Sequence, residues 1–258
     1  MTLTYIVLAT FLGGLLSVVI AASLTVTVLS KVVRSLVSLS AGVLLGTALI
    51  HLLPEAFESS AGAHELFLTL LGGLLFFFLL EKAELYRHGH HHEGDGDHHH
   101  HGFDHEQAGR GGWTVLVGDS IHNFCDGVII AGAFLVDARL GVVTALAIIA
   151  HEIPQEVGDY IVLLNAGFSR SKALLFNALS GLAAVLGGVV GYFVVRPWED
   201  LFPYLLVVAS SSFIYVAVAD LIPQLQRRLS LRETLSQLLW LAAGLGLILV
   251  LVEQFHGH

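Results

Sequence analysis

Two clusters of polar residues stand within apolar stretches of the sequence, and both carry side chains that bind metals. GDSIHNFCDG and HEIPQEVGD contribute Asp119, His122, Asn123, Asp126, His151, Glu152, Gln155, Glu156 and Asp159. A charged side chain at the centre of a bilayer costs about 2.5–3.5 kcal/mol on insertion scales, so such residues usually face a cavity and serve a function. Imidazole nitrogens with carboxylate and amide oxygens suit Zn²⁺ and its first-row neighbours. The clusters therefore predict a divalent metal site inside a membrane.

The spacing within and between the clusters favours two facing helices. His122 and Asp126 are four residues apart, as are His151 and Gln155, so each pair lies on one stripe of a helix. The residue that follows each histidine lies on the adjacent face of the same helix. There it could support these ligands or bind a second ion. The connection is centred near residue 138, and counting about 14 residues back and about 15 forward reaches the two clusters at nearly equal depth. Antiparallel neighbours would bring them face to face.

A proline inside the second cluster should free one backbone carbonyl. Pro154 cannot donate a helical hydrogen bond, so the carbonyl one turn earlier, near Ala150, loses its partner. Irregular backbone at membrane depth needs a polar cavity or surrounding protein. We expect this carbonyl to bind a cation or water.

Two further segments share a pattern of polar residue, apolar pair and proline. LIHLLPEAF contains His51 and Glu55, and VADLIPQL contains Asp220 and Gln224 at the same spacing. Aligning HLLPE with DLIPQ suggests an internal repeat that relates the first three helices to the last three, inverted in the membrane as in many transporters. Glu55 could instead reach the outer interface, and Asp220 could bond a neighbouring helix. The accessory metal or pathway groups that we expect are Glu55, Asp119, Glu156, Asp159 and Asp220.

The composition is that of a polytopic membrane protein. Of 258 residues, 55% are hydrophobic and 13% charged, whereas a soluble domain carries about 25% charged residues. Eight stretches approach the roughly 20 apolar residues that span a bilayer, if the few polar residues are accepted as buried. These stretches are residues 1–30, 35–54, 66–80, 113–136, 140–167, 172–195, 201–219 and 234–252. We therefore expect an all-α fold of eight transmembrane helices in one domain, residues 1–258.

The basic residues predict the orientation. With eight helices, ten of the 12 Lys and Arg flank connections on one side, and only Arg139 and Arg196 fall on the other. An excess of basic residues in short loops marks the cytoplasmic face, so both termini should lie outside the cytoplasm. No Lys or Arg precedes Lys31, so the first segment should remain as a helix and not act as a signal peptide. The compact loops suggest a bacterial inner membrane.

Several smaller features of the sequence concern helix packing, disulfide bonding and the expected partners. Gly42 with Gly46, and Gly187 with Gly191, are small-residue pairs at a spacing of four that lets helices approach closely. The single cysteine excludes an intrachain disulfide, and its angular position favours helix packing over metal binding. The net charge of −9 and the lack of a basic patch give no reason to expect nucleic acid. The expected partners are metal ions and the lipid bilayer, with a homodimer as the alternative to a monomer.

A histidine-rich segment separates the third and fourth helices. It reads HGHHHEGDGDHHHHGFDHE, and its composition predicts a disordered cytoplasmic loop over residues 87–111 that binds metal weakly. A solvated linker without a role in transport is the alternative. The histidines concerned are His88, His90, His91, His92, His98, His99, His100, His101 and His105.

The combination of HNFCDG and HEIPQEVGD resembles the signature of the Zrt/Irt-like (ZIP) family of metal transporters, in the branch whose fifth helix reads HEIPHE. HLLPE, the His-rich loop and the eight segments extend the resemblance along the chain. The resemblance implies uptake of Zn²⁺, or also Fe²⁺, Mn²⁺ or Cd²⁺, into the cytoplasm by helices arranged three, two and three, without an organic cofactor. The metal ligands that it implies are His51, His122, Asn123, Asp126, His151, Glu152 and Gln155.

Two departures from the family pattern concern the metal. Gln155 stands where histidine is usual, which exchanges a strong nitrogen ligand for a weaker amide. The sixth helix offers Asn177 and Ser180 where some members have a carboxylate that completes a second metal site. Ligand strength and the number of ions are therefore open.

The expected mechanism is alternating access, in which helices two, four and five shift against the rest. An efflux carrier is the alternative within transport. An intramembrane zinc protease is the enzymatic alternative, since HEIPQ begins like HExxH, but Gln155 replaces the second histidine and Pro154 interrupts the motif. We expect a transporter and not an enzyme.

Overall fold

The computed structural model describes residues 1–23, 26–89, 105–226 and 230–256, and within these ranges every regular element is a helix. The elements are α1 Thr2–Ser23, α2 Val26–Gly46, η1 Thr47–Leu52, α3 Leu53–Phe57, α4 Ala63–Gly89, α5 His105–Val136, α6 Ala138–Asn165, α7 Arg170–Val195, η2 Glu199–Leu201, α8 Phe202–Tyr215, η3 Val216–Leu221, α9 Ile222–Gln226 and α10 Leu231–His256. Eight stretches of the described chain are long and apolar enough to cross a membrane. The all-α prediction with eight spans is confirmed.

Some helix ends differ from the sequence prediction. The first helix ends at Ser23, not at residue 30, and α2 already begins at Val26. Likewise α5 begins at His105, eight residues before the apolar run that was expected to define it. An apolar run marks the part of a helix that suits lipid, whereas backbone hydrogen bonding can continue beyond it into water. Most of the expected His-rich loop, residues 90–104, lies outside the described residues.

The connections on either side of α6 contain recognisable caps. Asp137 is the only residue between α5 and α6, and its carboxylate accepts hydrogen bonds from the backbone N–H groups of Arg139 at 2.7 Å and Leu140 at 3.3 Å. After α6, Gly167 adopts a φ of 88°, which favours glycine. The next helix is capped by Ser169, whose hydroxyl accepts from the N–H of Lys172. The pair α5 and α6 is therefore a tight antiparallel hairpin.

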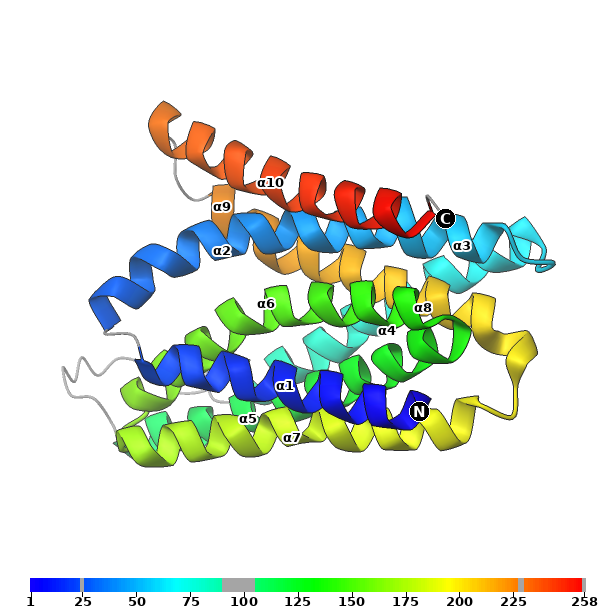
Figure 1. Cartoon of the computed structure of the whole chain (residues 1–258). Helices are drawn as coiled ribbons and strands as arrows, with labels where there is room; N and C mark the ends of the chain where they lie inside the picture. Colours follow the sequence, from blue (N-terminus) through cyan, green and yellow to red (C-terminus); the bar gives the residue numbers. More distant parts are fainter. Residues whose placement is uncertain (24–25, 90–104, 227–229, 257–258) are drawn as a thin grey trace.

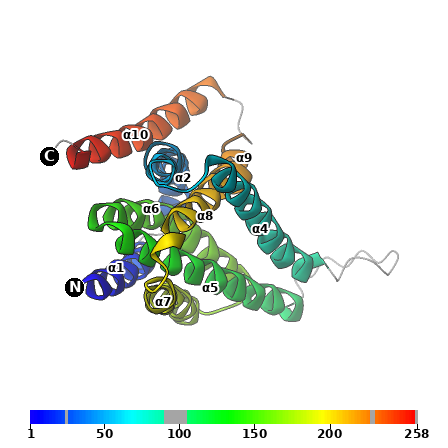
Figure 2. The ribbon, with the colours of Figure 1, turned by 90° about the vertical axis from the view of Figure 1, so that its right-hand side faces the viewer.

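The helices pack into two groups. In the first, α5 packs along α7, and α1 packs against both α6 and α7; in the second, α2 packs along α10 and α4 along α8. The two groups meet mainly where α2 lies against α6 and α8 against α5. Figure 2 shows this division end-on, with α1, α5 and α7 below, α2, α9 and α10 above, and α6 and α8 at the middle level. Both termini lie at the same end of the molecule in Figure 1.

Glycines let neighbouring backbones touch within each group. A Cβ atom added at Gly187 of α7 would lie 2.0 Å from the carbonyl oxygen of Phe124 in α5. In the second group, a Cβ at Gly42 of α2 would lie 2.2 Å from the carbonyl oxygen of Leu241 in α10. Only glycine permits these approaches, so the predicted close packing at both glycine pairs is confirmed.

Two π-helices interrupt the second group at matched positions. The N–H of Leu53 bonds the carbonyl of Ala48, and that of Ile222 bonds the carbonyl of Ala217, five residues back in each case. A five-residue α-helix follows each π-helix and has proline, Pro54 in α3 and Pro223 in α9, as its second residue. Since proline cannot donate the usual bond, a local change to wider turns re-satisfies the backbone. The aligned segments HLLPE and DLIPQ thus share an unusual backbone conformation.

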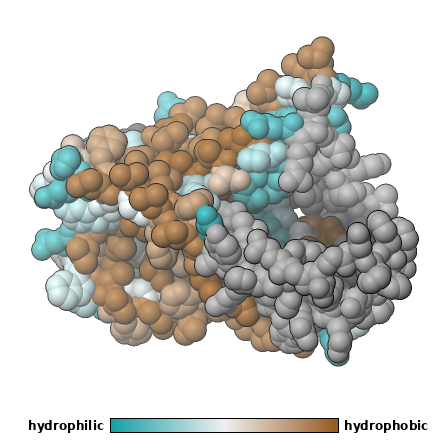
Figure 3. All heavy atoms as spheres, turned by 180° about the vertical axis from the view of Figure 1, so that it is seen from behind, coloured by the Kyte–Doolittle hydropathy of each residue, from teal (hydrophilic) through white to brown (hydrophobic). Residues whose placement is uncertain are grey.

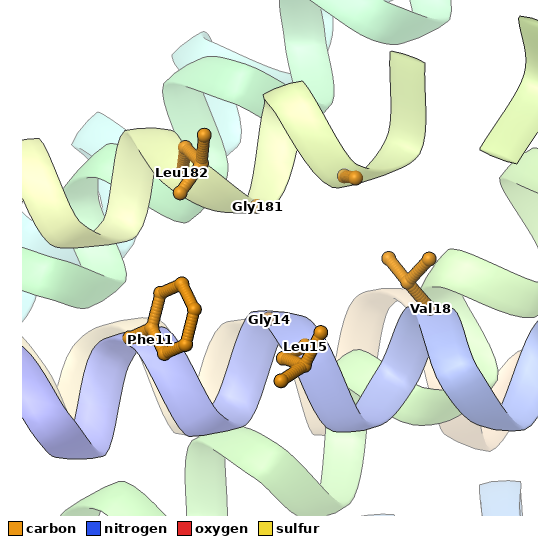
Figure 4. Close-up of a pocket in the computed structure, with 7 residues that line it drawn as sticks. Phe11, Gly14, Leu15, Val18, Gly181 and Leu182 are labelled. Carbon is orange, nitrogen blue, oxygen red and sulfur yellow. The ribbon is translucent and has the colours of Figure 1, made fainter. Parts of the chain in front are cut away.

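The outer surface suits lipid. In Figure 3, hydrophobic residues cover most of the middle of the face shown, and hydrophilic residues gather at the left-hand end and beside the grey residues. Between α1 and α7 lies a pocket of about 180 Å³, shown in Figure 4 and lined by Phe11, Gly14, Leu15, Val18, Ala178, Gly181 and Leu182. None of these residues can bind a cation through its side chain, so this pocket is not the metal route.

Candidate metal centre

Four side chains from α5 and α6 converge at one point in the middle of the membrane spans. His122 and Asp126 come from α5, and His151 and Glu152 come from α6, and each offers a ligand atom within 4.8 Å of the others. The Nε2 atoms of the two histidines are 3.3 Å apart. Four of the predicted ligands are thus brought together.

The separations of these atoms match the edges of a small tetrahedron. Asp126 Oδ2 lies 3.2 Å from His151 Nε2 and 3.8 Å from His122 Nε2. Glu152 Oε1 lies 3.6 Å from the same atom of His151 and 3.7 Å from that of His122. Four ligands at about 2.0–2.2 Å from a tetrahedral Zn²⁺ are separated by about 3.3–3.6 Å. The four side chains already have nearly the spacing that a Zn²⁺ ion would require.

Because these side chains are buried, their charges destabilise the protein unless a cation is bound. Asp126 is 1% exposed, His151 2% and Glu152 3%. Apart from their contacts with the histidines, the four carboxylate oxygens have no hydrogen-bond partner in the described part of the chain. Buried charges that lack partners are strongly destabilising, and they are usually paired or bound to metals. A bound divalent cation would remove this penalty.

The ring of His151 is held from both sides. Its Nδ1 atom lies 3.3 Å from the carbonyl oxygen of Ala147, one turn earlier in α6. A proton on Nδ1 makes this contact a hydrogen bond and leaves the Nε2 lone pair for a metal. The ring of Phe213, from α8, packs edge-on with its centroid 6.4 Å from that of His151. The imidazole therefore points its second nitrogen at the cluster.

A second cluster of three carboxylates adjoins the first. Asp119, Glu152 and Glu156 each offer an oxygen within 4.8 Å of the others, so Glu152 belongs to both clusters. Asp119 is 5% exposed and Glu156 is fully buried, and neither oxygen of Glu156 has a hydrogen-bond partner among the described residues. Asp119 lies one turn before His122, and Glu156 lies just over one turn after His151. The carboxylate cluster is thus displaced from the histidines toward the end opposite the termini.

Two predicted ligands contact this second cluster. The amide of Asn123 donates to Asp119 Oδ1 at 3.0 Å, and the amide of Gln155 donates to the same oxygen at 3.2 Å. Both amides therefore orient Asp119.

The sixth span, α7, supports the site through neutral groups. Asn177 is fully buried, and its amide donates to the backbone carbonyl of Glu156 at 2.8 Å. The hydroxyl of Ser180 lies 2.9 Å from that of Ser120 in α5. The carboxylate that faces α7 here is Glu156, which reaches the cluster from α6. Its Oε1 would lie 3.7 Å from a Cβ added at Gly181, so the side chain points at α7.

The carbonyl freed by the proline has a protein partner. The hydroxyl of Ser40, in α2, donates a hydrogen bond to the carbonyl oxygen of Ala150. This bond occupies one of the two lone pairs of the oxygen, so the binding of a cation or water there stays a prediction. Ser40 was not singled out from the sequence, although it belongs to a run of serines, SLVSLS, in an apolar span.

His51 and Glu55 lie outside both clusters. His51 follows Ser40 by eleven residues, so it lies about three helical turns nearer the end that holds the termini. It is 6% exposed and belongs to η1, and Glu55 is half-buried in α3. Their place is between the metal centre and the end of the second span that lies with the termini.

The remaining polar candidates are at or toward the opposite end. Asp220 is exposed on η3 and accepts a hydrogen bond from the amide of Gln224 at 2.9 Å. Asp159 is half-buried on α6, one turn beyond Gln155. His90, His91, His92 and His98–His101 lie outside the described residues, and no side-chain contact is described for His88 or His105, at the ends of α4 and α5.

Cys125 has surroundings that agree with a packing role. It lines a small pocket of about 140 Å³ with Phe76, Phe77, Val128, Ile129, Leu205 and Val208, all of them apolar. It does not belong to either cluster of metal-binding side chains.

Comparison with known proteins identifies the family. A family model described as ZIP zinc transporter matches residues 1–101 and 82–252. The chain is 31% identical over 280 residues to a Drosophila melanogaster protein named Zinc transporter ZIP13 homolog, covering 88% of this chain and 79% of that protein. It is 32% identical over 239 residues to Zinc transporter ZIP13 of Pongo abelii, covering 86% and 67% respectively.

A more local similarity concerns longer proteins. Over 113 residues the chain is 39% identical to human Zinc transporter ZIP6, covering 44% of this chain but 15% of that protein. The relatives named are animal proteins, whereas a bacterial source was expected. The family match, the eight spans and the buried histidine and carboxylate cluster agree with one another. The chain therefore belongs to the ZIP zinc transporter family: it is an integral membrane carrier of divalent metal ions, with Zn²⁺ as its substrate, and not an enzyme.

Proposed function

We propose that Zn²⁺ crosses the membrane through the cluster of His122, Asp126, His151 and Glu152. The observation that carries this proposal is the spacing of their ligand atoms, 3.2–3.8 Å over five measured pairs, which is close to the edges of a tetrahedral zinc site. A transported ion must also leave. Mixed histidine and carboxylate ligands, one of them shared with a neighbouring cluster, suit release better than a closed structural site.

The carboxylate cluster is the second position of the ion. Because Glu152 is common to both clusters, an ion can move from the histidines toward Asp119 and Glu156 while it keeps one protein ligand. Asn123 and Gln155 act here by holding Asp119 and by offering amide oxygens to the ion. The carboxylates also allow two ions to bind at once, since Glu156 supplies the charge that α7 lacks.

The residues outside the clusters define a route along the spans. His51 and Glu55 lie on the side of the termini and would receive the ion there. Asp159 and Asp220 lie toward the other end, and an exposed carboxylate in a membrane span needs a wet surrounding, which suits an exit path. The histidines of the segment 88–105 would then collect or sense ions at that end.

The direction that we propose is import, as the family resemblance implies. Ten of the 12 basic residues flank the end opposite the termini, which favours the cytoplasm for that end. Efflux is the alternative. Purified protein in liposomes, with Zn²⁺ accumulation followed under an imposed gradient and potential, distinguishes the two directions.

The packing favours a different moving unit from the one expected from the sequence. Helices α5 and α6 pack with α1 and α7, whereas α2 packs along α10 and against η3, which continues α8, and meets the first group at α6. Alternating access would then be a displacement of the group α1, α5, α6 and α7, which carries both clusters, against the other group. Location in a bacterial inner membrane, a homodimer and transport of Fe²⁺, Mn²⁺ or Cd²⁺ stay predictions.

The site is tested by His122→Ala and His151→Ala at matched expression. Each variant loses one of two strong nitrogen ligands, so we expect uptake of ⁶⁵Zn to fall at least about 30-fold, or about 2 kcal/mol. His64→Ala, an exposed histidine in the first turn of α4, is the matched control and should keep normal uptake. Near-normal uptake of ⁶⁵Zn in both variants would contradict the proposed site.

A further inference from the structure

Resting on the proposed function, we infer that Ser40 is a positioning residue for the metal centre, acting through the backbone carbonyl of Ala150. Its hydroxyl belongs to α2 and donates to a carbonyl of α6, the helix that carries His151 and Glu152. The two residues are 110 positions apart in the sequence. The hydrogen bond therefore joins the two groups of helices beside the metal ligands.

The need for this bond arises from Pro154. In an uninterrupted helix the N–H of residue 154 would bond the carbonyl of Ala150, but proline has no N–H. Ser40 is fully buried and Ala150 is half-buried, so water has only partial access to this carbonyl. A fully buried carbonyl without a donor costs about 1–3 kcal/mol, and the Ser40 hydroxyl removes the part of this cost that applies here.

The position of this carbonyl matters to the ligands. The carbonyl carbon of Ala150 is bonded directly to the backbone nitrogen of His151, so both belong to one rigid peptide plane. Fixing the oxygen of that plane fixes the start of the segment that presents His151 and then Glu152. Without Ser40, the turn between Ala150 and Pro154 keeps only its remaining helical bonds, and the two ligands can shift relative to α5.

Ser40 differs from the buried serines Ser17 and Ser210. Ser17 in α1 donates to the carbonyls of Gly13 and Gly14, and Ser210 in α8 donates to that of Leu206, so each bonds its own helix. Such bonds satisfy the hydroxyl but do not connect helices. Ser40 instead donates its hydrogen bond to a carbonyl of the other group of helices. A positioning role requires such a bond between the groups.

The hydrogen bond also depends on the relative position of the two groups. It exists only while α2 and α6 keep the register in which Ser40 faces Ala150. Tight binding of Zn²⁺ by the cluster is thereby linked to that register. A displacement of the groups would break the bond and loosen the site at the same step.

The test is a double-mutant cycle between Ser40 and Pro154, read as Zn²⁺ affinity of the purified full-length protein in detergent. We expect Ser40→Ala to weaken binding about three- to tenfold in the natural background. Pro154→Ala restores an N–H that can bond the Ala150 carbonyl, so in that background Ser40→Ala should change affinity less than twofold. Equal losses in the two backgrounds would overturn the inference, because the carbonyl would then not be the target.

Two controls separate positioning from general packing. Ser210→Ala removes an equally buried hydroxyl that bonds within its own helix, and it should leave affinity within twofold. Ser40→Thr keeps the hydroxyl and should bind Zn²⁺ more tightly than Ser40→Ala. A loss for Ser210→Ala equal to that for Ser40→Ala, or no advantage of threonine over alanine, would contradict the role.

The transport assay gives an independent reading. With Ser40→Ala in liposomes, KM for Zn²⁺ should rise three- to tenfold while the maximal rate stays within twofold, whereas a folding defect would lower the maximal rate alone. His122→Ala in the same assay shows whether the metal centre itself is correct. If His122→Ala has no effect, the proposed function fails; if only Ser40→Ala has none, the positioning role fails.

Discussion

The two groups of helices differ in where their backbone is regular. Helices α5 and α6, which carry both clusters, run without a break over 32 and 28 residues, and even Pro154 does not end α6. In the other group, α2 and α8 each give way to a six-residue π-helix and then to a short helix with proline. Ligands need fixed positions, which continuous helices provide. The irregular segments offer weaker backbone bonding, which suits the part of a carrier that adjusts.

The close packing of the regular group should be the feature most sensitive to mutation. Gly187→Val would place a side chain 2.0 Å from the carbonyl oxygen of Phe124 and force α5 away from α7. Overpacking of this kind costs about 1–3 kcal/mol or more, so we expect the melting temperature to fall by about 4–10 °C and Zn²⁺ uptake to be nearly abolished.

The matched control for that change is Gly72→Val in α4, where an added Cβ meets no atom within 4 Å. It should leave the melting temperature of the detergent-purified protein within about 2 °C. Equal sensitivity at the two glycines would show that the close contact between α7 and α5 is not what makes Gly187 sensitive.

A smaller effect is expected from the carboxylate that adjoins the zinc cluster. Glu156→Gln keeps the shape of the side chain but removes its charge from the second position of the ion. We expect the maximal transport rate to fall about tenfold, or about 1.4 kcal/mol, while Zn²⁺ affinity stays within threefold. Asp200→Asn, at an exposed carboxylate near η2, is the control. A loss of Zn²⁺ affinity as large as that of His122→Ala would contradict two separate positions and indicate that the two clusters form one site.

The smallest effect should come from the irregular segments. Pro54→Ala and Pro223→Ala each restore an N–H just after a π-helix and should favour regular α-helical turns there. We expect each to change the transport rate by about threefold, or about 0.7 kcal/mol, with unchanged Zn²⁺ affinity in detergent. Amide hydrogen exchange of residues 47–53 and 216–222 would report the backbone change. A response in one segment without the other would argue against their equivalence.

The sequence predicts this molecule well where a property belongs to one helix. Eight spans follow from apolar length, and the meeting of His122 with His151 follows from equal distances along a hairpin. It predicts less where a property depends on how separate helices face each other. The hydrogen bond from Ser40 to Ala150 needs the register of α2 on α6, which no local pattern encodes. For the same reason His51, which the family resemblance implies as a ligand, lies about three helical turns farther along its span.

Helix ends and π-helices are also hard to predict, for a different reason. The polar turns that extend α5 back to His105 carry no apolar signal. The wider turns of η1 and η3 differ from α-helix only in which carbonyl each N–H selects. Proline in HLLPE and DLIPQ indicates a disturbance but does not specify its form. The shared acidic ligand, Glu152, could be assigned to a helix face from the sequence, but not to two clusters at once.

The single-residue connection at Asp137 has a consequence for related sequences. His122 stands fifteen positions before this residue and His151 fourteen after it, with helix throughout on both sides. The interval of 29 residues between the histidines therefore determines their relative height and the direction in which each faces. One inserted residue within either arm would rotate its histidine by about 100° and raise it by about 1.5 Å. Alignments of functional relatives should consequently be free of gaps between these two positions, even where the surrounding loops vary in length.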